Sequence, residues 1–400
     1  MQKRQVYQKI KQDLEHKMVL LAGPRQVGKT TLAIDFIKEY SGIYYNWDED
    51  ADRALIQNSR LDFGKELWVF DELHKFRLWR NWLKGKYDKY GKEHKILVTG
   101  SAKLDAYSRG GDSLQGRYFA QRLHPFTLAE LLEAELPEDV ELYPLMQREI
   151  DEKVAKEIIK DMFQLGAFPE PFLGSSVRLA KRWRSSYGAR LVREDIRDLE
   201  SLINLDKVEV LYSHLPHTVA SPLSINSLRE DLEVSFESVR DWIKILEKNY
   251  ACFRLAPLGG KRIMKNIRAV KKEQKLYMWD FPLVEEKGNR FENFIACHLL
   301  KFVHWLEDIH GENVELRYFR DSRGHEVDFI VLKDSKPWMA IEAKKSAQSL
   351  DPNMKYLLER VKIPYAFQVH LEGEDYYKVD DINGAKVSII PAWRFLGNLT

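Results

Sequence analysis

The sequence is poor in cysteine, lacks long apolar runs and carries almost no net charge. Its two cysteines, Cys252 and Cys297, cannot build a disulfide framework and lack the spacing of metal ligands, which favours a reducing, cytoplasmic location. No apolar run approaches the ~20 residues that a membrane helix needs, and the N-terminal stretch has no apolar signal segment, so we expect no membrane partner. Internal repeats and low-complexity segments are also absent, which argues against a repeat protein.

Charges of opposite sign nearly balance along the chain. The sequence has 63 Lys and Arg residues against 61 Asp and Glu residues, and the net charge of +2 does not by itself indicate a nucleic-acid partner. Hydrophobic residues make up 44% and charged residues 31% of the chain, as in ordinary globular proteins. Because 400 residues are many for a single hydrophobic core, we expect two or three domains.

The stretch KMVLLAGPRQVGKTTLAIDFIKEY predicts a buried strand, a glycine-bearing loop and a helix. Gly23 and Gly28, followed by Lys29 and Thr30, have the spacing of a P-loop. In a P-loop, backbone amides face the phosphates, the lysine reaches the β- and γ-phosphates, and the hydroxyl binds Mg²⁺. The alternative is a glycine turn that binds nothing. The predicted nucleotide-binding residues of the loop are Gly23, Pro24, Arg25, Gln26, Val27, Gly28, Lys29, Thr30 and Thr31.

Two further apolar strands end in polar residues that suit the same site. The stretch KELWVFDELHK ends its strand at Asp71 and Glu72; we expect Asp71 to hold Mg²⁺ together with Thr30, and Glu72 to polarise the attacking water. The stretch HKILVTGSAK ends its strand at a Thr-Gly-Ser sequence, and Ser101 there is a candidate sensor of the γ-phosphate. These residues predict an ATP hydrolase that depends on Mg²⁺.

Residues 207–258 predict a helix-turn-helix followed by β-structure. The first helix begins near Ile225, a turn falls at residues 233–234, and Ser235 is the expected N-cap of a second helix. The apolar stripe of the second helix is formed by Val239, Trp242, Ile243 and Leu246. This order resembles a winged helix-turn-helix, whose second helix enters the DNA major groove. The alternative is a winged helix that serves only for packing between domains.

Basic residues on and after the second helix are the predicted DNA contacts. The outward face of that helix offers Ser238 together with Arg240 and Lys244, and residues 261–275 contain seven basic residues and one acidic residue. An Arg-rich stretch at residues 176–200 is compatible with phosphate contact or with a solvated helix face. The predicted DNA-binding residues are Arg240, Lys244, Lys261, Arg262, Lys265 and Arg268.

The stretch GHEVDFIVLKDSKPWMAIEAKKS predicts a β-hairpin with an acid on one strand and an acid and a lysine on the other. Glu342 and Lys344 are two residues apart and share a face, where Asp328 of the partner strand meets them. With Glu292 on a preceding helix, they form the pattern of PD-(D/E)XK nucleases, although no proline precedes Asp328. Such acids hold Mg²⁺ or Mn²⁺ beside the scissile phosphate, and the lysine activates water or stabilises the transition state.

Three readings of this hairpin stay open. The first is a metal-dependent nuclease with Asp328, Glu342 and Lys344 as catalytic residues and Glu292 as a further metal ligand. The second is a nuclease-like fold that binds DNA without cutting it. The third is an accidental surface ladder of charges, because Asp followed by Glu-x-Lys arises by chance in many sheets.

The motifs GPRQVGKTT, VFDELHK and VTGSA, in this order, resemble the AAA+ superfamily of ATPases. With RLVREDI, KLYMWD, FENFIACHLL and GHEVDFIV, the chain resembles the bacterial and archaeal branch that carries a C-terminal DUF4143 domain. The resemblance implies a P-loop α/β fold, ATP hydrolysis and self-assembly into a ring such as a hexamer. It also implies an arginine supplied by a neighbouring subunit, for which Arg117 is the candidate, with Arg109 and Arg122 as rivals. An intramolecular ion pair is the alternative role of Arg117. No clear second sensor arginine is present.

We therefore predict an α/β multi-domain protein. The expected segments are a P-loop AAA+ ATPase core at residues 1–125, a helical lid or connector at 126–175, a winged helix-turn-helix segment at 176–258 and a PD-(D/E)XK nuclease-like domain at 259–400. The predicted function is a Mg²⁺-dependent ATPase that remodels or translocates DNA as a homo-oligomer. The alternatives are a nucleotide-switched DNA-binding protein with a non-cutting clamp, and a signalling ATPase that binds a protein and no nucleic acid.

Overall fold

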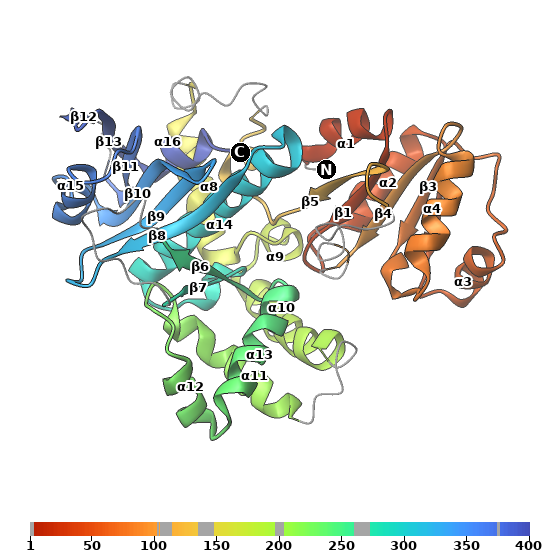
Figure 1. The fold of residues 1–400 in the computed structure, drawn as a ribbon, viewed down its shortest axis with the longest axis horizontal. Coiled ribbons are helices and arrows are strands. Elements are labelled where there is room, and N and C mark those ends of the chain that lie inside the picture. The colour runs from red at the N-terminus through yellow and green to blue at the C-terminus, as the bar shows by residue number, and fades with distance from the viewer. Residues whose placement is uncertain are drawn as a thin grey trace. The chain divides into compact units, whose positions relative to one another are not determined.

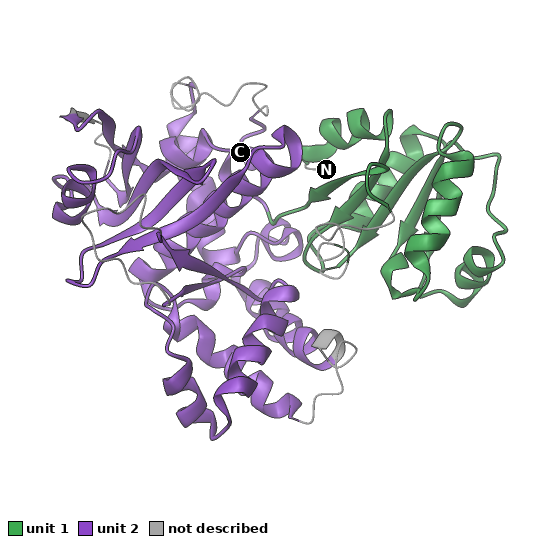
Figure 2. Cartoon of the chain, viewed as in Figure 1, with its two compact units in different colours: residues 1–125 green, residues 126–400 purple. Residues whose placement is uncertain are grey.

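The computed structural model describes residues 4–101, 104, 114–134, 148–196, 204–259, 273–373 and 377–400. The chain divides into two compact units, Met1–Pro125 and Phe126–Thr400 (Figure 2). In the described ranges no helix is both long and apolar enough to cross a membrane.

The first unit is a parallel β-sheet with helices on both faces (Figure 1). The five strands lie in the order β2-β3-β4-β1-β5, and every pair is parallel. Its elements are α1 (Val6–Leu14), β1 (Met18–Ala22), α2 (Lys29–Glu39), β2 (Ile43–Asn46), α3 (Asp50–Gln57), β3 (Leu67–Asp71), η1 (Leu73–Lys75), α4 (Trp79–Tyr90), β4 (Lys95–Gly100) and β5 (Tyr118–Arg122).

The central strands of this sheet are apolar throughout because both of their faces are covered. Along β1, Val19 and Leu21 pack on the side of α1 and α2, whereas Met18 and Leu20 pack on the side of α3 and α4. Two hydrophobic cores therefore sandwich the sheet. The carboxyl ends of β1, β3 and β4 meet at one edge, since Ala22 pairs with Gly100 and Asp71 is level with Thr99. The loop after β1 and the polar ends of β3 and β4 thus come together there.

The second unit begins with helices and continues into a large mixed sheet. Its helical elements are α6 (Leu128–Leu131), α8 (Glu152–Leu165), α9 (Pro169–Leu173), α10 (Val177–Arg190), the π-helical η2 (Leu191–Ile196), α11 (Leu205–His214), η3 (Leu215–Thr218), α12 (Ile225–Leu232), α13 (Phe236–Lys248), η4 (Phe281–Leu283), α14 (Lys287–His310), α15 (Pro352–Leu358) and α16 (Ala392–Gly397). The segment predicted as a lid or connector packs into the core of this unit, where α6 and α8 contact α16.

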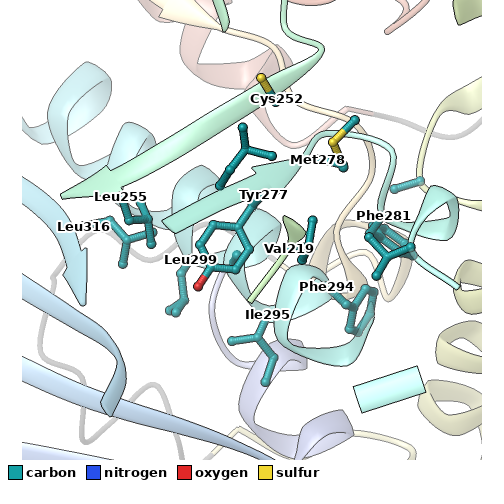
Figure 3. Packing of buried hydrophobic residues seen from close by; sticks show 14 of the residues in the cluster. Val219, Cys252, Leu255, Tyr277, Met278, Phe281, Phe294, Ile295, Leu299 and Leu316 are labelled. Carbon is teal, nitrogen blue, oxygen red and sulfur yellow. The ribbon is translucent and has the colours of Figure 1, made fainter. Parts of the chain in front are cut away.

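The sheet of the second unit has eight strands in the order β12-β13-β11-β10-β9-β8-β6-β7. The strands are β6 (Cys252–Pro257), β7 (Lys275–Met278), β8 (Val314–Arg320), β9 (Glu326–Lys333), β10 (Lys336–Ser346), β11 (Tyr365–Glu372), β12 (Tyr377–Ile382) and β13 (Ala385–Pro391). One continuous core joins α14 and the sheet to the helices before them; Figure 3 shows Tyr277 of β7 in this core among side chains that include Leu255 and Leu299. The predicted boundary at residues 258–259 falls between the paired strands β6 and β7.

Two local predictions are confirmed by the elements of this unit. The helix-turn-helix is α12 and α13, with Glu233 in a left-handed conformation between them and the Ser235 hydroxyl accepting from the Ser238 amide at 3.1 Å. The hairpin is β9 and β10, which pair antiparallel around Asp334 and Ser335. Both turn residues have positive φ, as a tight hairpin turn requires.

Candidate functional site

The loop after β1 has the backbone shape of a phosphate cradle. Gly28 is left-handed with φ of 101° and stands immediately before α2, so backbone amides and the positive end of the helix converge there. A Cβ on Gly23 would lie 2.4 Å from the backbone oxygen of Leu123, so only glycine fits. The Lys29 ammonium donates to the backbone oxygens of Gly23 at 2.8 Å and Pro24 at 2.6 Å. The Lys29 side chain therefore folds back onto the loop in which a phosphate is predicted to bind.

The Asp71 carboxylate lies beside this loop and accepts several hydroxyl hydrogen bonds. Thr30 donates to Oδ2 at 3.2 Å, Thr99 donates to Oδ1 at 2.5 Å, and the Tyr44 hydroxyl donates to Oδ2. A hydroxyl and a carboxylate oxygen are ligands that Mg²⁺ prefers. Thr30 and Asp71 therefore fit the predicted role and would hold Mg²⁺ through the hydroxyl and the carboxylate. Burial and the neighbouring Asp71 raise the pKa of Tyr44.

Glu72 occupies a constrained position next to Asp71. Its φ is 55°, and its amide donates to the Thr99 carbonyl at 3.0 Å, so the strand end turns sharply at this residue. Burial raises the pKa of the Glu72 carboxyl, an effect that the positive charge of Lys75 opposes. His74 Nε2 lies 3.5 Å from a Glu72 carboxylate oxygen and 3.5 Å from the Ser101 hydroxyl. The histidine thus links the predicted base to the predicted sensor.

The glycine between Thr99 and Ser101 makes room for this histidine. A Cβ on Gly100 would lie 2.7 Å from His74 Nδ1. Together, the ends of β1, β3 and β4 bring Lys29, Thr30, Asp71, Glu72 and Ser101 to one edge of the sheet. Of the other loop residues, Val27 is buried, Arg25 and Gln26 are half-buried, and Thr31 is exposed on α2.

The arginines proposed for a neighbouring subunit differ in their surroundings. Arg117 forms a two-point ion pair with Asp88 of α4, at 2.6 Å and 3.2 Å, which is the alternative that the sequence left open. Arg122 is buried at the end of β5, level with Ala22, and is therefore not presented to a second subunit. Arg109 lies outside the described residues. Arg117 would have to leave Asp88 in order to act on another subunit's nucleotide.

The outward face of α13 carries the predicted basic residues. The apolar stripe of this helix is buried, whereas the side chains of Arg240 and Lys244 are 41% and 51% exposed. Both contact Asp241, at 3.0 Å and 3.2 Å, so their positive charge is partly offset. Lys261, Arg262, Lys265 and Arg268 lie outside the described residues. Of the predicted basic segment 261–275, Lys275 is described, and its position contradicts a phosphate contact: the side chain is fully buried.

The predicted acidic residues of the hairpin do meet. The Asp328 carboxylate accepts from the Ala343 amide at 3.0 Å, and the Asp328 amide donates to Glu342 at 3.3 Å. Lys344 extends from the same strand as Glu342 and donates to its carboxylate at 2.7 Å; it also lies 2.7 Å from Asp351. These contacts bring Asp328, Glu342 and Lys344 to one face of the β9–β10 pair, as the strand alternation predicted.

The Lys275 ammonium stands among three carboxylates of this cluster. It lies 3.0 Å from Glu292, 2.5 Å from Glu326 and 3.4 Å from Asp328. Glu292 belongs to the second turn of α14 and also accepts from the Tyr277 hydroxyl at 2.7 Å. Burial favours the neutral lysine, but the carboxylates outweigh it and raise the pKa of Lys275. Burial, together with Asp328, raises the pKa of Glu292 to about 8 and that of Glu342 well above its usual value.

The predicted metal site at Glu292, Asp328 and Glu342 does not fit this geometry. Two of the three acids contact the Lys275 ammonium, and the third contacts Lys344. Across the described part of the chain, no group of three or more His, Cys, Asp or Glu side chains is arranged to hold a metal ion. The acids are close together, as predicted, but they are organised around lysines.

Three residues of these sites were missed by sequence reasoning. Tyr44 lies on β2, next to β3, and had no motif to mark it. His74 stands in the quoted VFDELHK motif, but its contacts with Glu72 and Ser101 depend on the fold. Lys275 is the first residue of the KLYMWD motif and was counted in a basic run instead. No local signal marked Lys275 for burial, because the acids that pair with it are distant in the sequence.

Comparison with known families agrees with this geometry. Residues 15–132 match the model of a family described as an AAA domain, a class of P-loop ATPase. Residues 287–395 match the domain of unknown function DUF4143, and residues 156–286 match the domain of unknown function DUF8612. The chain thus carries an AAA-type ATPase domain followed by a C-terminal DUF4143 domain, and the AAA domain indicates nucleotide binding and ATP hydrolysis. The family resemblance in the sequence motifs is confirmed.

Individual relatives are distant. The chain is 23% identical over 392 residues to the uncharacterized protein Rv2008c of Mycobacterium tuberculosis and to the uncharacterized protein Mb2031c of Mycobacterium bovis, covering 95% of this chain and 81% of each relative. Among solved structures, it matches PCH-2 of C. elegans (13% identity, TM-score 0.21) and the STAND protein PH0952 of Pyrococcus horikoshii, an ATPase with a tetratricopeptide repeat sensor (14% identity, TM-score 0.22). These matches cover 60% and 76% of this chain and 66% and 47% of the solved chains.

Proposed function

We propose that this protein hydrolyses ATP at the carboxyl edge of the first sheet and uses the energy to act on DNA as a homo-oligomer. The observation that carries the ATPase assignment is the convergence of Lys29, Thr30, Asp71 and Glu72 on the loop after β1. Thr30 and Asp71 would hold Mg²⁺, which would supply charge stabilisation to the phosphates. We also propose four segments: the ATPase core at 1–125, a helical lid or connector at 126–175, a winged helix-turn-helix segment at 176–258 and a nuclease-like domain at 259–400.

The residues of this site have distinct roles in the proposed reaction. Lys29 exchanges the carbonyls of its own loop for the β- and γ-phosphate oxygens. Glu72 accepts a hydrogen bond from the attacking water, and His74 holds the Glu72 carboxylate near Ser101. Thr99 fixes the Asp71 carboxylate through its hydroxyl. Arg117 is the proposed contribution from a neighbouring subunit, which requires that assembly break its pair with Asp88.

DNA is the proposed substrate because of the middle and C-terminal segments. α12 and α13, followed by the antiparallel strands β6 and β7, have the order of a winged helix, and α13 turns Arg240 and Lys244 outward. The order α14, β8, β9, β10, with Asp328 and Glu342 meeting on the hairpin, supports a nuclease-like fold. The competing proposal is a signalling ATPase whose winged helix binds a protein, and it predicts ATP turnover that DNA does not change.

The test compares ATP binding and turnover in Lys29→Ala, Glu72→Gln and the parent protein, with and without forked DNA. Lys29→Ala should weaken ATP binding by about 100-fold, because charge-assisted hydrogen bonds to the phosphates are lost. Glu72→Gln should bind ATP normally but turn it over about 100- to 1,000-fold more slowly, because the base is lost.

Lys38→Ala is the matched control, since Lys38 is an exposed lysine in the last turn of α2, away from the loop. Unchanged ATP affinity in Lys29→Ala would overturn the nucleotide site. DNA that leaves the turnover of the parent protein unchanged would overturn the DNA assignment and favour a protein partner. The two results are independent of each other.

A further inference from the structure

We infer that Lys275 takes the place of a divalent cation in the acidic cluster of the C-terminal domain, so that this domain engages DNA without cutting it. The inference rests on the proposed DNA function and on the nuclease-like reading of the hairpin. It favours a domain that binds DNA without cutting it over a metal-dependent nuclease, two readings that the sequence left open.

The position of Lys275 is the first support. Its side chain is fully buried, and its ammonium lies within 3.4 Å of Glu292, Glu326 and Asp328. These acids come from α14 and β9, so the lysine on β7 joins separate elements in the way that a bound cation would. A Lys ammonium is a compact positive charge with three donors and can serve three acceptors at once.

The packing around the ammonium is the second support. The Tyr318 ring lies with its centroid 5.5 Å from the nitrogen, and the Tyr277 hydroxyl donates to the same Glu292 oxygen that Lys275 contacts. Pairing is the usual condition for burying a charge, and removing one partner is strongly destabilising. Displacing Lys275 to admit a metal ion would therefore bury an unpaired ammonium or require the strand to move.

The remaining acids near the hairpin are also paired with a lysine of the same domain. Glu342 and Asp351 are both paired with Lys344, at 2.7 Å each. Lys344 is the residue that the nuclease pattern would use for water activation or transition-state stabilisation. Here it is bound by two carboxylates. Phosphodiester cleavage by this pattern needs metal-held carboxylates, so the lysine-filled cluster leaves a fold suited to binding.

The test is Mn²⁺ binding to the full-length, nucleotide-free protein, followed by electron paramagnetic resonance of the free ion. The parent protein and Asp328→Asn should bind Mn²⁺ identically, because Asp328 faces Lys275 rather than a metal. Lys275→Met should gain a Mn²⁺ site that the double variant with Asp328→Asn lacks. Lys344→Met is the matched control and should gain none, because Lys275 is still in place.

Two results of the Mn²⁺ measurements would overturn the inference. One is Mn²⁺ bound by the parent protein at a site that Asp328→Asn abolishes, a measurement that does not require any Lys275 variant to fold. The other is a folded Lys275→Met protein that gains no site. Neither measurement involves ATP or DNA, so a failure here is distinguishable from a failure of the proposed function. Mg²⁺-dependent cleavage of labelled forked or four-way DNA by the parent protein, lost in Asp328→Ala, would also overturn it.

Discussion

The nucleotide site and the acidic cluster contain the same kinds of residue, but the lysine has different partners in each. Each has a buried lysine and nearby carboxylates. In the first, Lys29 donates to the backbone carbonyls of Gly23 and Pro24, and Asp71 accepts from hydroxyls. In the second, Lys275 is held directly by the carboxylates of Glu292, Glu326 and Asp328.

The different partners mean that Lys29 can exchange its hydrogen-bond acceptors for those of a ligand, whereas Lys275 keeps its carboxylates. Hydrogen bonds from a lysine to neutral carbonyls are weaker than those to carboxylates, so phosphate oxygens can replace the carbonyls around Lys29. A lysine among several buried carboxylates has no better partner to move to. In the first unit the lysine is therefore placed so that a ligand could replace its partners, whereas in the second unit the lysine holds strands and a helix together.

Replacing each lysine by methionine should separate these roles most clearly. Lys275→Met leaves buried carboxylates without their cation and should destabilise the protein by about 3–5 kcal/mol. Lys29→Met removes the hydrogen bonds to the neutral carbonyls of Gly23 and Pro24 and should cost about 1 kcal/mol. Chemical denaturation followed by far-ultraviolet circular dichroism measures both. Equal stability losses in the two variants would remove the distinction between the sites.

Acid should weaken the second unit through another buried group, His298. Its Nε2 accepts from the Leu128 amide at 3.1 Å and its Nδ1 donates to the Phe294 carbonyl at 2.8 Å. Burial lowers the pKa of His298 from 6.5 to about 4. Between these values the unfolded chain binds a proton that the folded chain does not, so stability falls as the pH drops. The loss between pH 7 and pH 5 should be about 2 kcal/mol.

His298→Gln isolates this contribution, because an amide oxygen can still accept from Leu128 but does not titrate. Unfolding midpoints in urea at pH 7 and pH 5 provide the measurement. The variant should lose about 2 kcal/mol less than the parent over this interval. If parent and variant lose the same stability, the pH dependence comes from other groups and the assignment to His298 is wrong.

The smallest expected effect concerns Tyr44, which donates to Asp71 in the nucleotide site. Tyr44→Phe removes a hydrogen bond that Mg²⁺ must compete with, so Mg²⁺–ATP should bind about 3- to 10-fold more tightly. Titration with a fluorescent ATP analogue in Mg²⁺ measures this, and the same titration in a chelator is the control and should not change. Weaker binding in Mg²⁺ would instead make Tyr44 part of the metal shell.

Much of the fold follows from short-range patterns. The strand, loop and helix around Gly28, the Ser235 cap between α12 and α13, and the hairpin that carries Asp328 all lie where local spacing predicted them. Hydrophobic periodicity, turn residues and caps act within a few residues, which is why a sequence reveals them.

The partners of charged side chains could not be predicted from local sequence patterns. Arg117 pairs with Asp88, 29 residues earlier, and Lys275 meets Asp328, 53 residues later. Nothing in the local pattern distinguishes Lys275 from the basic residues just before it. Its burial follows from β7 joining the edge of the sheet through β6, which brings the start of the strand toward α14 and β9.

By itself the sequence determined the domains that the chain carries: an AAA-type ATPase domain with a P-loop pattern and a DUF4143 domain with an acidic hairpin. It did so because phosphate cradles and strand ends are encoded in contiguous residues. The tertiary structure alone decided which charges meet. It put hydroxyls around Asp71 and lysines among the hairpin acids, because the stability of a buried charge depends on the groups that folding brings beside it.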